Sequence, residues 1–246
     1  MKLSFYQKMS AIGRVFKTIY RDAYHLKLEA EADELHKFIS SDSVCFDIGG
    51  SYGTYTLVMS RLAKDGCVYS FEPGSYSHWV LKRVIKYCRL KNVSLVNQAL
   101  GGYEGKEQLV IPQKKSKKFG YSLAHIKSSA DISVSDIKEE VVLTTIDKFC
   151  VQRNIKRVDF IKCDAEGAEY SIFKGAERTI EKHFPTVLCE VDGGHLNKFG
   201  FSPQHIFDFF NQKGYSMYIL DKGNLLNAKD ISKNSNYFFI HSSKKF

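Results

Sequence analysis

An acid and three glycines follow a short apolar segment near residue 45. Val44–Ile48 is typical of a buried strand, Asp47 lies near its end, and Gly49, Gly50 and Gly53 lead into a helical pattern. In an open α/β sheet the carboxyl ends of the strands form the ligand crevice, and glycine lets the backbone turn sharply and approach a ligand closely. Because the spacing Gly-Gly-x-x-Gly differs from the dinucleotide fingerprint Gly-x-Gly-x-x-Gly, the segment predicts a different ligand.

A second acid, Glu72, ends the next apolar segment, Cys67–Phe71. A carboxylate about 20 residues after such a glycine turn accepts hydrogen bonds from ribose hydroxyls in nucleoside-binding sheets; the alternative is a surface glutamate. Asp47 is placed to offset an ammonium or sulfonium group. Two anions suit a nucleoside with a cationic tail better than a dinucleotide with phosphates.

Three carboxylates, Asp164, Glu166 and Glu169, come directly after the apolar segment 158–163. They could form a metal site or an acid–base cluster, or they could complement the dipole at the start of the next helix. We assign Asp164 to the crevice and leave both interpretations open for the two glutamates.

Several blocks of this sequence resemble the FkbM-type S-adenosylmethionine-dependent methyltransferases, in the order that the family has them. The blocks are residues 47–56, 71–73, 97–100, 143–147, 161–169 and 174–176. The resemblance implies a Rossmann-like methyltransferase fold, an α/β structure whose mostly parallel seven-stranded sheet has an antiparallel last strand and helices on both faces. It also implies transfer of a methyl group to a hydroxyl oxygen, often of a sugar or a natural product.

The same resemblance implies which residues hold S-adenosylmethionine. They are Asp47, Gly49, Gly50 and Gly53 at the methionine end, Glu72 at the ribose, and Gln98 and Ala99 beside the adenine. Gly50 and Ser51 stand where the family usually has Ala and Asn, so hydrogen bonds that this Asn makes are not expected here.

For the chemistry, a hydroxyl acceptor needs a group that takes its proton. We expect Asp164 to orient the acceptor, His195 to act as the base, and Glu190 to hold whichever of them moves. His195 follows Gly193 and Gly194, which predict a loop just beyond a strand end. In a less favoured alternative, Asp164 and Glu190 coordinate Mg²⁺, which would lower the pKa of the hydroxyl.

Alternating strand and helix patterns position these residues and predict a parallel sheet flanked by helices. The expected strands are 44–48, 67–71, 93–96, 158–163 and 186–191, with a closing pair at 215–220 and 237–241; the expected helices are 54–63, 76–89, 168–183 with a break near Gly175, and 203–213. Residues 101–146, rich in Lys, Ser and Gly, predict a partly mobile insertion with β-like pieces at 108–111 and 141–144, which could lie over the crevice. We therefore expect a helical N-terminal extension over residues 1–40 and a methyltransferase domain over residues 41–246.

Positive charge is concentrated in two short segments of the 246-residue chain, whose net charge is +9. Residues 1–27 carry six cations and one anion, and residues 114–118 carry four more cations. Since the remainder is neutral, a broad nucleic-acid-binding face is not expected. An RNA or protein methyltransferase guided by the basic segments and a non-catalytic nucleoside-binding or membrane-associated scaffold remain the alternatives.

The first of these segments also shows an apolar stripe with spacings of three and four residues, which predicts an amphipathic helix. The stripe comprises Phe5, Met9, Ile12, Phe16, Ile19, Ala23 and Leu26. We expect it to dock on the domain, and a second subunit or an anionic membrane surface are the other options. The segment lacks the features of a secretory signal.

The six cysteines include no Cys-x-x-Cys pair, so a zinc ribbon or redox motif is not expected. Cys45, Cys163 and Cys189 lie in apolar strand-like segments. They are typical of core residues in a reducing compartment, which makes the cytoplasm the expected location. The expected partner is a small-molecule or glycan acceptor, and homo-oligomers are left open.

Overall fold

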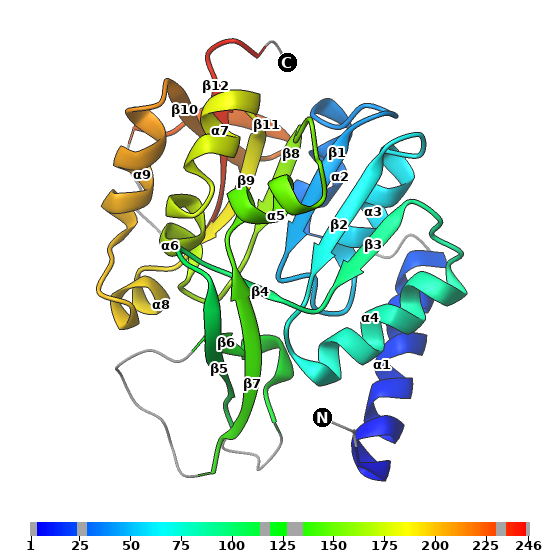
Figure 1. Cartoon of the computed structure of the whole chain (residues 1–246). Helices are drawn as coiled ribbons and strands as arrows, with labels where there is room; N and C mark the ends of the chain where they lie inside the picture. Colours follow the sequence, from blue (N-terminus) through cyan, green and yellow to red (C-terminus); the bar gives the residue numbers. More distant parts are fainter. Residues whose placement is uncertain (1–3, 24–28, 114–118, 127–134, 230–234, 245–246) are drawn as a thin grey trace.

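The computed structural model describes residues 4–23, 29–113, 119–126, 135–229 and 235–244. Within them the main sheet has eight strands in the order β11-β10-β12-β9-β8-β1-β2-β3 (Figure 1). Their bounds are β1 Val44–Ile48, β2 Cys67–Phe71, β3 Val93–Val96, β8 Phe160–Cys163, β9 Thr186–Val191, β10 Tyr215–Asp221, β11 Asn224–Asn227 and β12 Ser235–His241. The strands from β3 to β9 in this order are parallel, and β12 runs antiparallel to both β9 and β10.

This arrangement confirms the predicted Rossmann-like fold and corrects the number of strands from seven to eight. The additional strand, β11, forms a hairpin with β10, and Asp221 pairs with Asn224 across the turn. Lys222 and Gly223, the two turn residues, both have positive φ, at 47° and 82°. Two such residues in succession are typical of the tight turns that match the twist of a hairpin.

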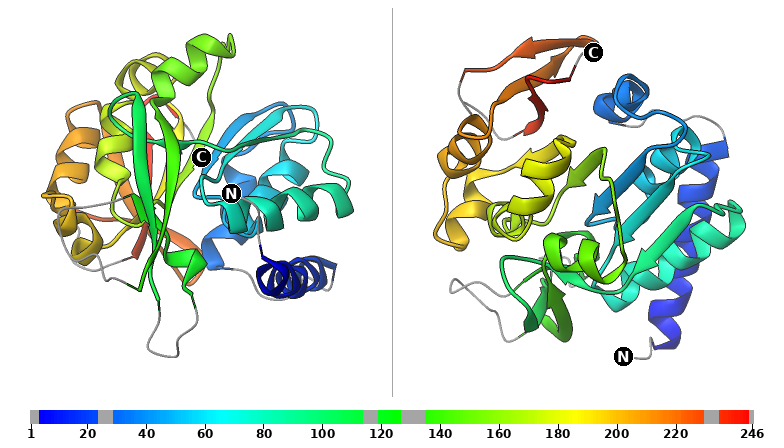
Figure 2. Two further views of the ribbon diagram at one scale, coloured as in Figure 1. Left: turned by 60° about the horizontal axis from the view of Figure 1, so that its bottom comes forward. Right: turned by 45° about the horizontal axis from the view of Figure 1, so that its top comes forward.

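Helices cover both faces of the main sheet, as the two views of Figure 2 show. They are α3 Thr54–Leu62, α4 Ser75–Tyr87, α5 Ile146–Gln152, α6 Glu169–Lys174, α7 Glu177–His183, α8 Gly193–Lys198 and α9 Pro203–Asn211. Successive strand residues serve opposite faces: Cys45 packs in one hydrophobic core and Phe46 in the other. Cys163 and Cys189 are also buried free thiols, as predicted.

The insertion forms a smaller sheet of its own, in the order β4-β7-β5-β6. Its strands are β4 Ala99–Leu100, β5 Gly105–Ile111, β6 His125–Ile126 and β7 Ile137–Thr144. The predicted pieces 108–111 and 141–144 lie inside β5 and β7, which pair antiparallel. The basic run 114–118 lies outside the described residues.

The N-terminal helices are α1 Phe5–Ala23, α2 Ala30–Glu34 and the 3₁₀ turn Leu35–Lys37. α1 packs across α4 (Figures 1 and 2) and buries Ala11 and Val15, which join a hydrophobic cluster with Tyr76 of α4. The expected packing of the stripe is therefore wrong for its middle part, because Met9, Ile12 and Phe16 are exposed. Small and β-branched side chains let two helices approach closely, which larger ones at the contact would prevent.

In the described part of the chain, no helix combines the length and the apolar run that crossing a bilayer requires.

The break between α6 and α7 supplies a test of the packing. A Cβ atom at Gly175 would lie 2.1 Å from the carbonyl oxygen of Gly101. We therefore expect Gly175→Ala to lower the free energy of unfolding by about 1 to 3 kcal/mol, because backbone must move. In the matched control Gly13→Ala the new methyl meets nothing within 4 Å, and alanine favours the helix by roughly 0.5 to 1 kcal/mol. Urea unfolding of both variants checks this, and equal midpoints would contradict it.

Candidate active site

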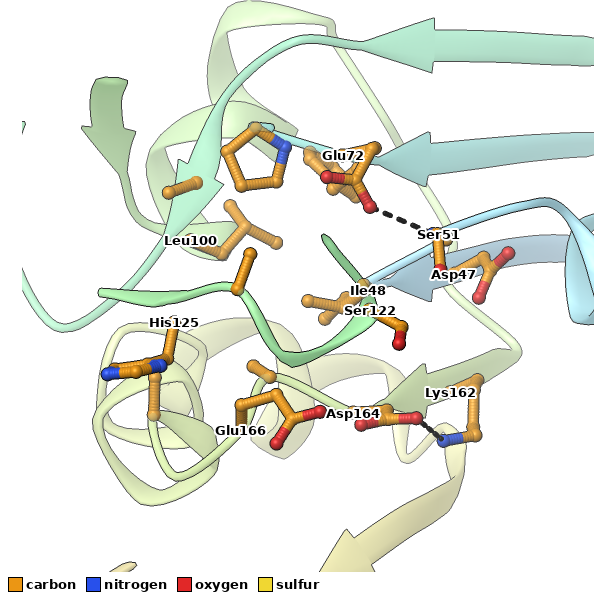
Figure 3. A pocket seen from close by; sticks show the side chains of 18 of the residues that line it. Asp47, Ile48, Ser51, Glu72, Leu100, Ser122, His125, Lys162, Asp164 and Glu166 are labelled. Atoms are coloured by element: carbon orange, nitrogen blue, oxygen red, sulfur yellow. Dashed lines mark hydrogen bonds and ion pairs between the residues drawn. The ribbon is translucent and has the colours of Figure 1, made fainter. Parts of the chain in front are cut away.

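A pocket of about 240 Å³ lies at the carboxyl ends of β1, β2 and β8. Asp47, Glu72 and Asp164 line it from these three strand ends. Figure 3 looks into the pocket and shows Glu72 on one side, with Asp164 and Glu166 on the opposite side. Ser122 and His125 from the insertion also line it, so the insertion does reach the crevice as expected.

The strand register explains the surroundings of Asp47. This residue pairs with Ser70 on β2 and with Lys162 on β8. Its carboxylate is buried and accepts a hydrogen bond from the Thr56 hydroxyl on α3. Burial raises the pKa of Asp47 to about 6, although the Thr56 hydroxyl and the Lys162 ammonium act in the opposite direction.

Glu72 is held rigidly from two sides. Its Oε1 accepts from the backbone N–H of Gly74 and its Oε2 from that of Ser51, both at 2.9 Å. Burial raises the pKa of Glu72 to about 8, against the effect of these two bonds. Each oxygen of a carboxylate can accept more than one hydrogen bond, so both can still accept from a ligand.

The glycine turn follows β1, and its N–H groups at Gly49 and Gly50 both donate to the carbonyl of Phe71 at 3.1 Å. Gly49 has φ +79°, and a Cβ there would lie 1.9 Å from the carbonyl oxygen of Asp164. At Gly53, with φ +93°, a Cβ would lie 2.7 Å from Leu81. The packing of the protein itself therefore requires glycine at these positions, whether or not a ligand approaches.

A buried ammonium lies beneath the pocket. Nζ of Lys162 is 3.4 Å from Oδ2 of Asp164 and 5.0 Å from the centre of the Tyr55 ring. Burial disfavours the charge on Lys162, but Asp164 and Glu190 more than compensate and raise its pKa. Burial likewise disfavours the charge on Asp164, yet Lys162 and a hydrogen bond with Glu190 lower its pKa. Burial and the hydrogen bond with Asp164 raise the pKa of Glu190 to about 8.

Glu166 and His195 form a second pair. Nδ1 of His195 lies 3.0 Å from Oε2 of Glu166, and Glu166 lines the pocket with φ +53°, a conformation that non-glycine residues seldom adopt. Burial, Asp164 and Glu169 raise the pKa of Glu166 to about 7. Glu169 has a structural role, because it is buried and its Oε1 accepts from the N–H groups of Ala165 and Gly167.

Not every sequence-predicted residue lines the pocket. Asp47, Gly49, Gly50, Glu72, Ala99 and Asp164 do, whereas Gly53, Gln98, Glu190 and His195 are not among its lining residues. The loop expected around His195 is wrong: this residue belongs to α8, whose first turn is capped when Asp192 accepts from the N–H of His195 at 3.0 Å. Asp at the N-cap was the available signal for a helix start.

Sequence reasoning missed Lys162, Ser122 and His125. Lys162 stands inside an apolar run, where a lysine is buried only when it is paired; its partner Asp164 directly follows the same strand, and Glu190 lies on β9. Burial lowers the pKa of His125. The position of the two insertion residues over the pocket follows from tertiary structure alone.

The ion pair in β8 can be tested through its pH dependence. We expect Lys162→Met to lower the free energy of unfolding by about 1 to 3 kcal/mol at pH 8, because Asp164, whose side chain is 38% exposed, loses its buried partner. Without the ammonium the pKa of Asp164 rises above its unfolded value, and a carboxyl with a raised folded pKa contributes stability at low pH that is lost as the pH rises. The loss should thus be smaller at pH 5.

Urea titrations at both pH values measure this difference. The matched control is Lys106→Met, which removes an exposed pair with Glu140 at 2.8 Å and should leave the midpoint of unfolding almost unchanged at either pH. A loss for Lys162→Met that does not depend on pH would contradict the interpretation.

The chain is similar to known methyltransferases in sequence and in fold. Residues 47–217 match the family model of the methyltransferase FkbM domain. "Methyltransferase 1" of Beauveria bassiana (strain ARSEF 2860) is 24% identical over 172 residues, which are 62% of this chain and 67% of that protein. The crystal structure of a methyltransferase FkbM from Methylobacillus flagellatus KT superimposes with a TM-score of 0.52 at 16% identity, over 82% of this chain and 44% of that chain.

The last comparison concerns the fold alone, and this chain spans less than half the length of that structure. The family model, in contrast, covers more than half of the present chain and includes Asp47, Glu72, Asp164 and Glu166. The chain therefore belongs to the FkbM methyltransferase domain family.

Proposed function

We propose that this protein transfers a methyl group from S-adenosylmethionine to a hydroxyl oxygen of a sugar or a glycan-related metabolite. The observation that carries the proposal is Glu72, a buried carboxylate fixed by two backbone N–H groups at the end of β2 and directed into the pocket. Membership of the FkbM domain family adds the reaction class.

The residues of the pocket fit this cofactor. Glu72 has an acceptor on each oxygen for the two ribose hydroxyls, and the apolar residues Ala99 and Leu100 beside it offer a wall for the adenine. Asp47 and Asp164 supply negative charge toward the ammonium and sulfonium groups. When bound, the cofactor supplies an electron-poor methyl group.

On the acceptor side, the chain must hold a hydroxyl in line with that methyl group, at about 3 Å. Asp164, kept ionised by Lys162, accepts the hydrogen bond that orients the hydroxyl. Glu166 lines the pocket and contacts His195, so a proton that leaves the acceptor reaches His195 through Glu166. Ser122, His125 and Glu166 are polar lining residues, which suits a polyhydroxylated acceptor.

The metal alternative has less support from the geometry. Asp164 is paired with Lys162, and Glu190 is hydrogen-bonded to Asp164. Both carboxyl groups thus have partners within the protein, and the described residues contain no group of three or more His, Cys, Asp or Glu side chains arranged around an ion site.

Cofactor binding gives the first test. Loss of a charge-assisted hydrogen bond typically costs about 1.5 to 3 kcal/mol, so Glu72→Ala should weaken binding of S-adenosylhomocysteine roughly tenfold or more. Isothermal titration calorimetry measures this, with Glu140→Ala on the exposed side of β7 as the matched control. Unchanged affinity in the Glu72 variant would remove this residue from the site, and preference for NAD would refute the proposed cofactor.

The reaction itself can be followed with labelled methyl donor and a panel of glycans, RNA and protein, with and without a chelator. We expect label on a glycan or sugar hydroxyl, indifference to the chelator, and a rate that rises with pH through about 7 as Glu166 loses its proton. Glu166→Gln and His195→Ala should lower kcat by about 10²- to 10⁴-fold, the usual contribution of a positioned base, with cofactor affinity intact.

Three results would count against this mechanism. Label on RNA or protein would show that the acceptor is not a sugar hydroxyl. Activity that is lost with a chelator and restored by Mg²⁺ would favour the metal mechanism over the base mechanism. Near full turnover in both variants and in Asp164→Asn would leave only the cofactor site.

A further inference from the structure

Helix α1 carries an exposed apolar face. Met9, Ile12 and Phe16 are 55%, 38% and 68% exposed, and their spacing of three and four residues places them on one side of the helix. A neighbouring side is already used, because Ala11 and Val15 are buried against α4. A contiguous apolar surface of this kind marks an interaction site.

The same surface is strongly cationic. Lys8 and Lys17 on α1 are exposed and flank the apolar stripe on its two sides, and no acid occurs between Phe5 and Arg21. The neighbouring α4 has the sequence SYSHWVLKRVIKY, which contains three cations and no acid. Figure 2 (left) shows the two helices side by side.

We propose that this face of α1 docks on an anionic lipid bilayer. A helix with an apolar stripe between lysines and arginines lies in the plane of a membrane interface, where the apolar side chains enter the acyl boundary and the cations meet lipid phosphates. A second copy of this chain fits less well, since two such faces would bring like charges together. Nucleic acid would pair with the cations but offers no apolar layer for Met9 and Ile12.

A different side of α1 faces the pocket. Gln7 Nε2 donates to the Tyr121 hydroxyl at 3.1 Å, and the Arg14 guanidinium lies 5.2 Å from the centre of the Tyr52 ring. Both tyrosines line the pocket. Gln7 and Arg14 lie on the opposite side of α1 from Met9, Ile12 and Phe16, so docking would leave these contacts intact.

Vesicle sedimentation of the full chain tests the docking without any assay of activity. We expect pelleting with vesicles of phosphatidylglycerol and phosphatidylcholine, and little with phosphatidylcholine alone. The double variant Ile12→Ser, Phe16→Ser should weaken the binding about tenfold or more, because two apolar side chains no longer enter the bilayer. Val151→Ser is the matched control, since Val151 is 77% exposed on α5.

Equal pelleting by the wild type and the double variant would overturn the proposal, as would no pelleting of the wild type or retention on RNA in place of vesicles. Calorimetry with S-adenosylhomocysteine separates the two proposals. The double variant should bind this ligand as the wild type does, because neither exposed side chain lines the pocket. A wild type that does not bind S-adenosylhomocysteine would refute the proposed function but would not affect the vesicle result.

Discussion

Carboxyl groups crowd around the ends of neighbouring parallel strands, and one buried ammonium lies among them. The groups are Asp47, Glu72, Asp164, Glu166 and Glu190. A parallel sheet brings all its carboxyl ends to one edge, so acids suited to a cationic nucleoside must also repel one another. Lys162 offsets part of this repulsion, and the raised pKa of Glu190 removes more of it. The site is therefore a compromise between attraction for a ligand and self-repulsion of the protein.

Much of the fold could be predicted from the sequence because the strands are continuous apolar runs. Val93–Val96 and Thr186–Val191 were predicted with the bounds that the structure has, and Gly175 separates α6 from α7 as expected. β11 was missed because Asn224–Asn227 is short and lies at an edge, where no burial pattern develops. α8 was missed since two glycines at its start suggested a loop, and the Asp192 cap outweighs them.

The site residues that belong to local sequence motifs could be predicted, whereas those brought to the site by tertiary packing could not. Asp47 lies near the end of one apolar strand and Glu72 directly follows another, in a pattern that sequence alone displays. The contact between Glu166 and His195 depends on a positive φ at Glu166 and on α8, neither of which has a clear signal in composition. Helix α1 shows the same limit: its periodicity predicted a helix, but the side that packs is chosen by the small Ala11, which lets α4 come close.

The position of β12 has a consequence for the order of assembly. This strand lies between β9 and β10, although β10 precedes it in the chain. During synthesis β9 therefore presents an unpaired apolar edge to the cell until residues 235–241 have emerged, and such edges invite pairing with other chains. The sheet that positions Asp164 and Glu190 is complete only after β12 has paired with β9. A chain that terminates before β12 should therefore aggregate, because the edge of β9 stays unpaired.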